Sequence, residues 1–284
     1  MALAACVVLA GAAGPKAGLQ TSIKVGPSPW THARVDDRPQ DFAFAVVSDL
    51  ESGYRPGVFE VAAAELALLR PAFILTTGDL IEGGTEDAAL LHKEWDAFDA
   101  RLAATPAPFV HLPGNHDMTN LTQRKVWAER YGPRYSWFVY KDVLFLLLDT
   151  EDYSEAEMQQ IYRERAEYLA LRKSDPQAAK TAPYTKRQES FSGQVSAAQS
   201  AFFEKAIAAH PKVRWTILLM HKPVYLRKDE PGLARIEAAL KGRPYTLLNG
   251  HLHRYAYSTR NGRDYITLGT TGGERGFDGS AGAF

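Results

Sequence analysis

The chain has 284 residues, enough for one large domain or two small ones. Its 33 basic and 33 acidic side chains balance, which argues against a protein whose surface coats nucleic acid or an anionic membrane. The single cysteine, Cys6, excludes an intramolecular disulfide and leaves the redox compartment open.

An uncharged run of small and apolar residues covers positions 2–13. It is too short to span a membrane but matches the apolar part of a secretory signal peptide, so we expect a leader at residues 1–20 and an exported, periplasmic or secreted, protein. The stretch Leu3–Cys6 also resembles a bacterial lipoprotein cleavage site. The alternative is a frayed apolar terminus on a cytoplasmic protein, because the first basic residue, Lys16, follows the run.

Residues 21–40 predict an extended lead-in, because Pro27, Pro29 and Pro39 interrupt any regular pattern. Trp30 is expected to dock this lead-in on the domain that follows. That domain is expected to cover residues 41–284.

The first half of the domain alternates apolar runs with helical patterns. Strands are expected at 42–47, 72–76 and 109–112, and helices at 58–70 and 87–102. Short links between strand, helix and strand indicate right-handed parallel units. Polar residues follow each strand, at Asp49, at Asp79 and at Asn115–Asp117. Ligands bind beyond the carboxyl ends of strands in open α/β sheets, so we expect these residues on one rim.

The second half adds an antiparallel component. The turns Lys141-Asp142 and Asn261-Gly262 each indicate a hairpin. Strands are expected at 135–140, 143–148, 214–220, 245–248, 255–259 and 265–268, and helices at 196–209 and 235–241. Two of these strands end in histidines, one at His221 and one at His251 and His253.

A charged segment at residues 151–192 interrupts this alternation and is helical in pattern from 155 to 172. So long a polar segment is typical of a solvated insertion, and a lid over the site is the alternative. It carries no motif that identifies a substrate.

Five short blocks, taken together and in order, resemble the calcineurin-like metallophosphoesterase superfamily. The blocks are Asp49, Gly78-Asp79, Gly114-Asn115-His116-Asp117, His221 and Gly250-His251-Leu252-His253, and the resemblance covers residues 42 to about 270. A turn residue or a core histidine explains one block but not five. The resemblance implies an α/β fold, a four-layer α/β/β/α sandwich with two mixed β-sheets, as in metallo-dependent phosphatases. It also implies metal-dependent hydrolysis of a phosphoester, with a bridging hydroxide attacking phosphorus.

The resemblance further implies two divalent metal ions, with Mn, Fe, Zn and Mg as candidates. Asp79 would bridge them, because two ions about 3.5–4 Å apart need a shared carboxylate. The other ligands would be Asn115, His221 and His251 at one ion and Asp49 and His253 at the other. Since side chains alternate along extended backbone, His251 and His253 are expected to point the same way if that segment is extended.

The resemblance makes His116 the general acid that protonates the leaving group. We expect its neighbour Asp117 to orient the imidazole and to raise its pKa. A turn-stabilising role for Asp117 is the compatible alternative.

One position departs from the family. Its first block is usually Asp-x-His, whereas this chain has Asp49-Leu50-Glu51. Glu51 could replace the histidine as a metal ligand, which would favour harder ions such as Mn or Mg. Alternatively Glu51 faces solvent, and this metal site is weak.

Other residues carry weaker signals. Arg254 and Lys222 adjoin ligand positions and could bind a substrate phosphate, although a solvated charge is the simpler explanation for each. The expected partner is a small-molecule or protein phosphoester, with no nucleic acid and no transmembrane span. Because Glu51 replaces a ligand, a catalytically weak binding or accessory protein is the alternative function.

Overall fold

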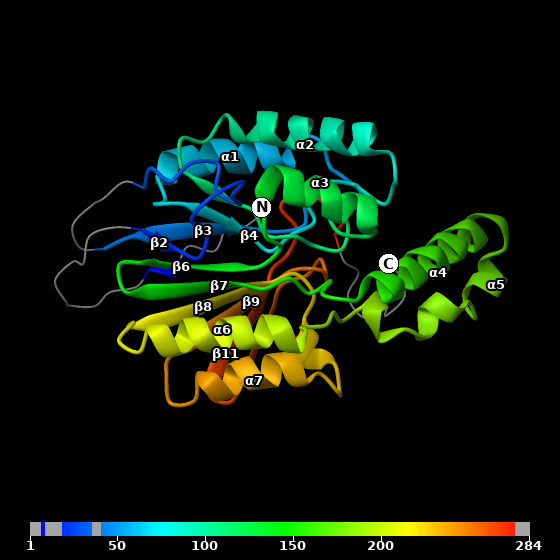
Figure 1. Cartoon of the computed structure of the whole chain (residues 1–284). Helices are drawn as coiled ribbons and strands as arrows, with labels where there is room; N and C mark the ends of the chain where they lie inside the picture. Colours follow the sequence, from blue (N-terminus) through cyan, green and yellow to red (C-terminus); the bar gives the residue numbers. More distant parts are fainter. Residues whose placement is uncertain (1–6, 9–18, 36–40, 276–284) are drawn as a thin grey trace.

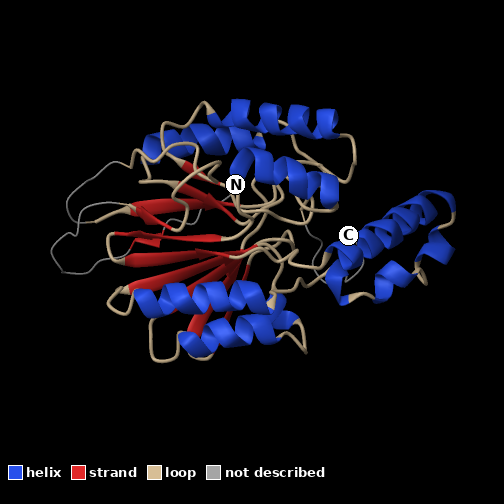
Figure 2. Cartoon of the chain, viewed as in Figure 1, coloured by secondary structure: helices blue, strands red, loops and turns tan. Residues whose placement is uncertain are grey.

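In the computed structural model, two β-sheets pack face to face and helices cover both outer faces (Figure 1, Figure 2). The structure describes residues 7–8, 19–35 and 41–275. The smaller sheet has the order β1-β3-β4-β5. Its strands are β1 (Val7–Val8), β3 (Ala43–Val47), β4 (Ile74–Thr76) and β5 (Phe109–Val110). Strands β3, β4 and β5 run parallel, and β1 is antiparallel to β3.

The larger sheet has the order β10-β11-β9-β8-β7-β6-β2. Its strands are β2 (Gln20–Thr21), β6 (Ser136–Tyr140), β7 (Val143–Leu147), β8 (Trp215–Met220), β9 (Tyr245–Asn249), β10 (Ala256–Arg260) and β11 (Arg263–Thr267). Strands β7, β8, β9 and β11 run parallel, while β2, β6 and β10 are antiparallel to their neighbours. Both sheets are therefore mixed, and both predicted hairpins are confirmed.

One group of helices lies on the outer face of the smaller sheet and another on that of the larger sheet (Figure 1). The first group is α1 (Val58–Leu69), α2 (Ala88–Leu102) and α3 (Leu121–Tyr131), and the second is α6 (Ala197–Ala209) and α7 (Pro231–Ala239). The insertion projects from one end of the sandwich (Figure 1). It contains α4 (Glu155–Ser174), α5 (Pro176–Ala179) and the short 3-10 helices η1 (Pro183–Lys186) and η2 (Gln188–Ser190), while η3 (Val224–Leu226) follows β8.

Alternation along the strands divides the apolar side chains between three layers of core. In β3, Phe44 and Val46 face the other sheet, whereas Ala45 and Val47 face the helices. Strand β7 does the same on the other side, with Phe145 buried between the sheets. A continuous apolar run is thus explained by burial on both faces, and the predicted four-layer sandwich is confirmed.

Helices α3 and α7 differ from the expectations, as does the short α5, which lies where no helix was expected. Helix α3 was not predicted; it begins after Asn120, whose side chain accepts a hydrogen bond from the Gln123 amide. Helix α7 begins at Pro231, four residues before the expected start, because Pro231 occupies the first helical position and Glu230 caps it through the Leu233 amide.

The lead-in docks on the smaller sheet, as expected. Trp30 forms a bridge with Val110, and its ring packs edge-on against Phe73 and Phe138 between the sheets. The predicted leader lies outside the described residues, except for Val7–Val8 and the segment from residue 19. Among the residues that the structure describes, no helix has both the length and the apolar character that crossing a bilayer requires.

Candidate metal centre

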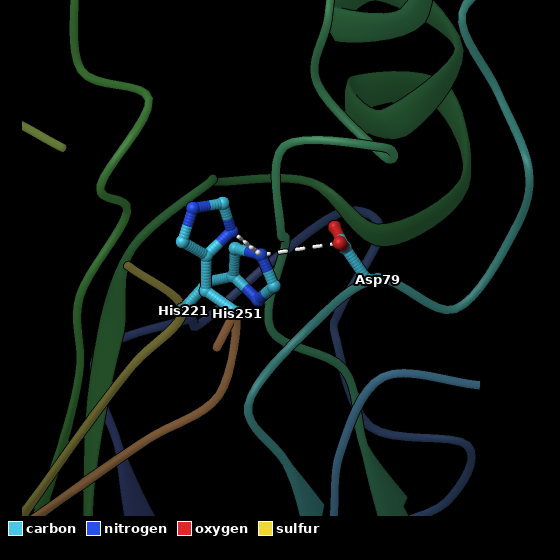
Figure 3. A group of neighbouring side chains, drawn as sticks. All are labelled: Asp79, His221 and His251. Atoms are coloured by element: carbon cyan, nitrogen blue, oxygen red, sulfur yellow. Dashed lines mark hydrogen bonds and ion pairs between the residues drawn. The ribbon is translucent and has the colours of Figure 1, made fainter. Parts of the chain in front are cut away.

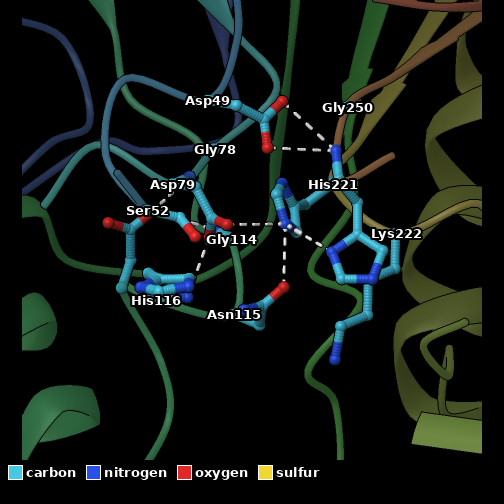
Figure 4. Close-up of polar contacts among 12 residues, drawn as sticks. Asp49, Ser52, Gly78, Asp79, Gly114, Asn115, His116, His221, Lys222 and Gly250 are labelled. Carbon is cyan, nitrogen blue, oxygen red and sulfur yellow. Dashed lines mark hydrogen bonds and ion pairs between the residues drawn. The ribbon is translucent and has the colours of Figure 1, made fainter. Parts of the chain in front are cut away.

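The polar residues that follow the strands of both sheets meet at one edge of the sandwich (Figure 4). They are Asp49, Asp79, Asn115 and His116 from the smaller sheet and His221, His251 and His253 from the larger sheet. The rim predicted for the first half of the chain is therefore only half of the site. The site lies on the seam between the sheets, and each sheet supplies part of it.

One group of candidate ligands consists of Asp79, His221 and His251, all buried (Figure 3). One ligand atom from each lies within 4.8 Å of the other two. The Nε2 atom of His221 is 3.2 Å from Oδ2 of Asp79, 2.9 Å from Oδ1 of Asn115 and 3.3 Å from Nδ1 of His251. A carboxylate, an amide oxygen and two imidazoles thus converge on one point.

A second group consists of Asp49, Asp79 and His253, whose ligand atoms also lie within 4.8 Å of one another. The Nε2 atom of His253 is 3.3 Å from Oδ1 of Asp49. Asp79 belongs to both groups, which is the arrangement that two ions sharing one carboxylate require. Carboxylate oxygens and imidazole nitrogens are suitable donors for divalent metals, so the residues present fit such ions.

The backbone at these residues is not extended, so the condition for aligning His251 with His253 by alternation is not met, although both histidines reach the centre. Four site residues lie in the left-handed region, with φ values of 49° at Asp49, 58° at Asp79, 71° at His251 and 51° at His253. Such conformations cost of order 1 kcal/mol each and persist where the surroundings hold them. At His251 the main-chain amide donates to both carboxylate oxygens of Asp49, at 3.1 and 3.2 Å.

Two of the histidines are oriented by main-chain carbonyls. The Nδ1 atom of His221 lies 2.9 Å from the carbonyl oxygen of Thr77, and that of His253 lies 2.7 Å from the carbonyl oxygen of Glu274. These contacts assign the proton to Nδ1 and leave Nε2 facing the centre as a donor of electrons. The sequence held no signal for Thr77 or Glu274, because their contribution comes from the backbone.

The ionisable side chains at the centre shift one another's pKa values. Burial alone would lower the pKa of His221, but the carboxylate of Asp79 raises it to about 9. Burial would raise the pKa of Asp79, but His221 and His116 hold that pKa well below its usual range. Burial and the neighbouring His221 keep the pKa of His251 well below its usual value. Asp79 is therefore ionised and attracts positive charge to this point, as a proton or as a metal ion.

His116 lies beside Asp79 but belongs to neither ligand group (Figure 4). Its main-chain amide donates to Oδ1 of Asp79 at 2.8 Å. Its imidazole is held through Nδ1, which lies 2.7 Å from the carbonyl oxygen of Glu82. The ring is thus fixed next to the centre without being one of the clustered donors.

The expected contact between Asp117 and the imidazole of His116 is wrong. The carboxylate of Asp117 instead accepts main-chain hydrogen bonds from Asp79 at 2.9 Å, Gly114 at 2.8 Å and Leu80 at 3.0 Å. Asp117 is buried, and the hydrogen bonds of its carboxylate go to the main chain of these loops and not to the ring. Only the turn-stabilising alternative for Asp117 agrees with these contacts.

Neither expected position of the Glu51 side chain is correct, whereas the weakness of this metal site stays a prediction. Its carboxylate belongs to neither ligand group, and it does not face solvent. Oε1 of Glu51 instead pairs with Nη2 of Arg101 at 3.0 Å. Arg101 lies in the last turn of α2, so nothing near Glu51 in the sequence indicated this partner.

The two basic candidates differ. The expected solvated charge at Lys222 is wrong, because its Nζ is buried, 2.6 Å from Oε1 of Glu151 and 2.8 Å from the carbonyl oxygen of Glu189. Lys222, which directly follows His221 in the chain, thus contacts both the start of the insertion at Glu151 and its end at Glu189. Arg254 is exposed beside His253, and its substrate contact stays a prediction.

Comparison with known proteins agrees with this geometry. Residues 42–255 match the family described as calcineurin-like phosphoesterase. The chain belongs to that family. No curated protein sequence matches the chain.

Among solved structures, one with a TM-score above 0.5 shares the fold. A dimetal phosphatase from Danio rerio is similar with a TM-score of 0.57 and 15% identity, over 81% of this chain and 88% of that chain. GAP50, the anchor in the inner membrane complex of Plasmodium, has a TM-score of 0.46 and 14% identity over 80% and 71% of the two chains. A phosphopantetheinyl hydrolase from Mycobacterium tuberculosis has a TM-score of 0.41 and 14% identity over 80% and 89%.

Membership of the calcineurin-like phosphoesterase family makes the chain a phosphoester hydrolase that uses divalent metal ions. The two clusters around Asp79 are the candidate binding residues for such ions.

Proposed function

We propose that this chain hydrolyses a phosphoester with two divalent ions held on either side of Asp79. The observation that carries this proposal is the membership of Asp79 in both clusters of ligand atoms. Asn115, His221 and His251 would complete one site, and Asp49 and His253 the other. Ions bound there would neutralise charge on the phosphoryl oxygens and lower the pKa of a water molecule to give the nucleophile.

The chain itself supplies the proton for the leaving group. His116 is fixed beside Asp79 by the carbonyl oxygen of Glu82 at Nδ1, so the transferable proton is on Nε2. In its doubly protonated form, an imidazolium in this position would give its Nε2 proton to the departing oxygen as the ester bond breaks, while the Nδ1 proton stays bonded to Glu82. Arg254, exposed at the same edge, is the candidate to bind a phosphate oxygen.

The two sites differ in their donors. The first offers one carboxylate, one amide oxygen and two imidazoles, a set that suits Zn or Fe. The second offers two carboxylates and one imidazole, because Glu51 is engaged by Arg101. We infer that the second site prefers harder ions such as Mn or Mg and binds them more weakly.

The ion pair between Glu51 and Arg101 favours one alternative, a catalytically weak binding or accessory protein. If the site at Asp49 and His253 never binds a metal ion, the protein holds one metal ion and lacks the two that the proposed hydrolysis needs.

The two functions are separated by an assay of small-molecule mono- and diesters and of a phosphoprotein. The chain is stripped with a chelator and reloaded with Mn, Zn, Fe or Mg, and Asp79→Asn serves as the control. Metal-dependent turnover that Asp79→Asn abolishes, with loss of bound metal, supports the hydrolase. Bound metal without turnover on any ester supports the accessory protein, and turnover that survives in chelator contradicts both.

A further inference from the structure

Glu51 stands close to the bridging residue through its main chain. The amides of Leu50 and Glu51 both donate to the carbonyl oxygen of Asp79, at 2.9 and 3.3 Å. Its side chain nevertheless leaves the centre, since the carboxylate is part of neither ligand cluster. Glu51 is therefore a carboxylate beside a cation site that it does not line.

An ion pair with Arg101 explains why the Glu51 carboxylate does not line the metal centre. Its guanidinium lies 3.0 Å from Oε1 of Glu51, with 18% of the Arg101 side chain and 12% of the Glu51 side chain exposed. Such shielding makes the attraction stronger than in a fully solvated surface pair. The guanidinium is also placed over the rings of Tyr54 and Phe98, with Cζ 5.0 and 5.8 Å from the ring centroids.

The position of Arg101 is set by helix packing and not by the metal centre. Arg101 belongs to α2, which is held on the smaller sheet by the buried side chains of Trp95, Phe98 and Leu102. The guanidinium thus stays in place whether or not an ion is bound at Asp49. Its stacking on Tyr54 also leaves it a favourable contact if the carboxylate moves away.

We propose that Arg101 sets the metal affinity of the site formed by Asp49, Asp79 and His253, by withholding the carboxylate of Glu51 from it. This inference rests on the proposed two-metal function. Without Glu51 the site has three protein ligands, whereas the site on the other side of Asp79 has four. Release of Glu51 would supply the fourth donor, so Arg101 keeps the two sites unequal.

A double-mutant cycle tests the inference, because Arg101→Gln also removes a positive charge that repels an ion. Mn binding to chelator-stripped protein is titrated by calorimetry and by electron paramagnetic resonance in four chains: the unaltered chain, Arg101→Gln, Glu51→Gln and the double variant. We expect Arg101→Gln to tighten the weaker site roughly tenfold or more when Glu51 is present, the scale on which outer-shell partners alter metal affinity. The gain from Arg101→Gln should be much smaller when Glu51 is already Gln.

Arg130→Gln is the matched control. It removes a guanidinium from Asp96 and Asp99, which belong to the same helix as Arg101, and should leave Mn affinity unchanged. Equal gains in both backgrounds of the cycle, or no gain, would overturn the inference.

A second variant does not depend on removing Arg101. Glu51→His places an imidazole at the same position, and Arg101 would not hold an imidazole as it holds a carboxylate. The Mn affinity of the weaker site should therefore rise. Unchanged Mn affinity would contradict the inference. Failure of the proposed function is separate, since it would be seen as absence of turnover in a chain whose weaker site still responds to Arg101→Gln.

Discussion

The main-chain amide of Asp79 donates to Oδ2 of Asp117 at 2.9 Å, so the candidate bridging carboxylate is positioned by a second, buried carboxylate. Asp117 also accepts from Gly114 at 2.8 Å. In return, Oδ1 of Asp79 accepts from the His116 amide at 2.8 Å. The loops after β4 and β5 are thus locked together by two aspartates that each bind the main chain of the other loop.

Asp117→Asn should therefore lower stability and metal binding, and not only the acid catalysis attributed to His116. Each carboxylate oxygen of Asp117 accepts from two main-chain N–H groups, whereas an amide has one acceptor oxygen, so two of these N–H groups would lose their partner, at a cost of about 1–3 kcal/mol each. We expect that loss in urea unfolding of the metal-free chain, together with weaker Mn binding. Unchanged stability with reduced turnover alone would return Asp117 to the role of supporting His116.

His116→Gln should lower turnover according to the leaving group. A general acid typically contributes 10²–10⁴-fold, and it matters most when the departing oxygen is strongly basic. We expect roughly that loss with alkyl phosphates, a smaller loss with nitrophenyl phosphate, and unchanged metal content because His116 is in neither ligand cluster. Equal losses on both esters would show that His116 does not deliver the proton.

Gly83 and Gly84 provide a matched pair beside His116. Both have positive φ, 58° and 67°, so alanine strains the backbone similarly at each. A Cβ on Gly83 would overlap the carbonyl oxygen of His116, whereas on Gly84 its nearest neighbour is the Arg165 guanidinium at 3.6 Å. Gly83→Ala should lose stability and turnover well beyond Gly84→Ala, measured by urea unfolding and ester hydrolysis. Similar losses in both would mean that backbone strain alone matters.

Lys222→Met should destabilise the chain through Glu151. Removing one partner of a buried ion pair leaves the other charge uncompensated and costs about 3–5 kcal/mol. Urea unfolding in chelator should show this loss, and Lys222→Met combined with Glu151→Gln should recover most of it. The control is Lys125→Met, since Lys125 and Glu129 form an exposed pair at 4.0 Å that contributes less than about 1 kcal/mol. A loss no larger than in this control would contradict the prediction.

Asp149, buried after β7, should make stability depend on pH. Burial raises the pKa of its carboxyl group from 3.8 to about 6, although Arg134 opposes the shift. The folded chain then binds a proton more tightly than the unfolded chain does. The resulting stability is present below about pH 4 and is lost as pH rises through about 6. The stability advantage of the unaltered chain over Asp149→Asn should thus fall by on the order of 2 kcal/mol between pH 4 and pH 7 in urea unfolding. An advantage that grows with pH would show that the Arg134 pair outweighs burial.

The strands and their terminal residues could be predicted because both signals are local. Continuous apolar runs such as residues 42–47 and turn pairs such as Asn261-Gly262 depend on neighbours in the chain. Helix α3 escaped because its core contact is made by few side chains, chiefly Trp127 and Tyr131, which pack on Trp95 of α2. That contact depends on a helix elsewhere in the sequence.

The details of the centre could not be predicted for the same reason. Glu51 is turned away by Arg101, 50 positions later, and Lys222 is buried by Glu151, 71 positions earlier. The partners of the Nδ1 atoms of His221 and His253 are main-chain carbonyl groups, which every residue type has. Side-chain identity indicated which residues would gather, whereas their hydrogen bonds depended on packing between the two sheets.

Asp49 and Asp79 come from one sheet, and His221, His251 and His253 from the other. Any ion that binds both sets would act as a cross-link between two sheets that also share an apolar core. Chelation would then loosen the attachment of one half to the other, and saturating metal would raise resistance to unfolding in proportion to the logarithm of its concentration. The metal ions of this hydrolase would then also stabilise the packing of its two sheets.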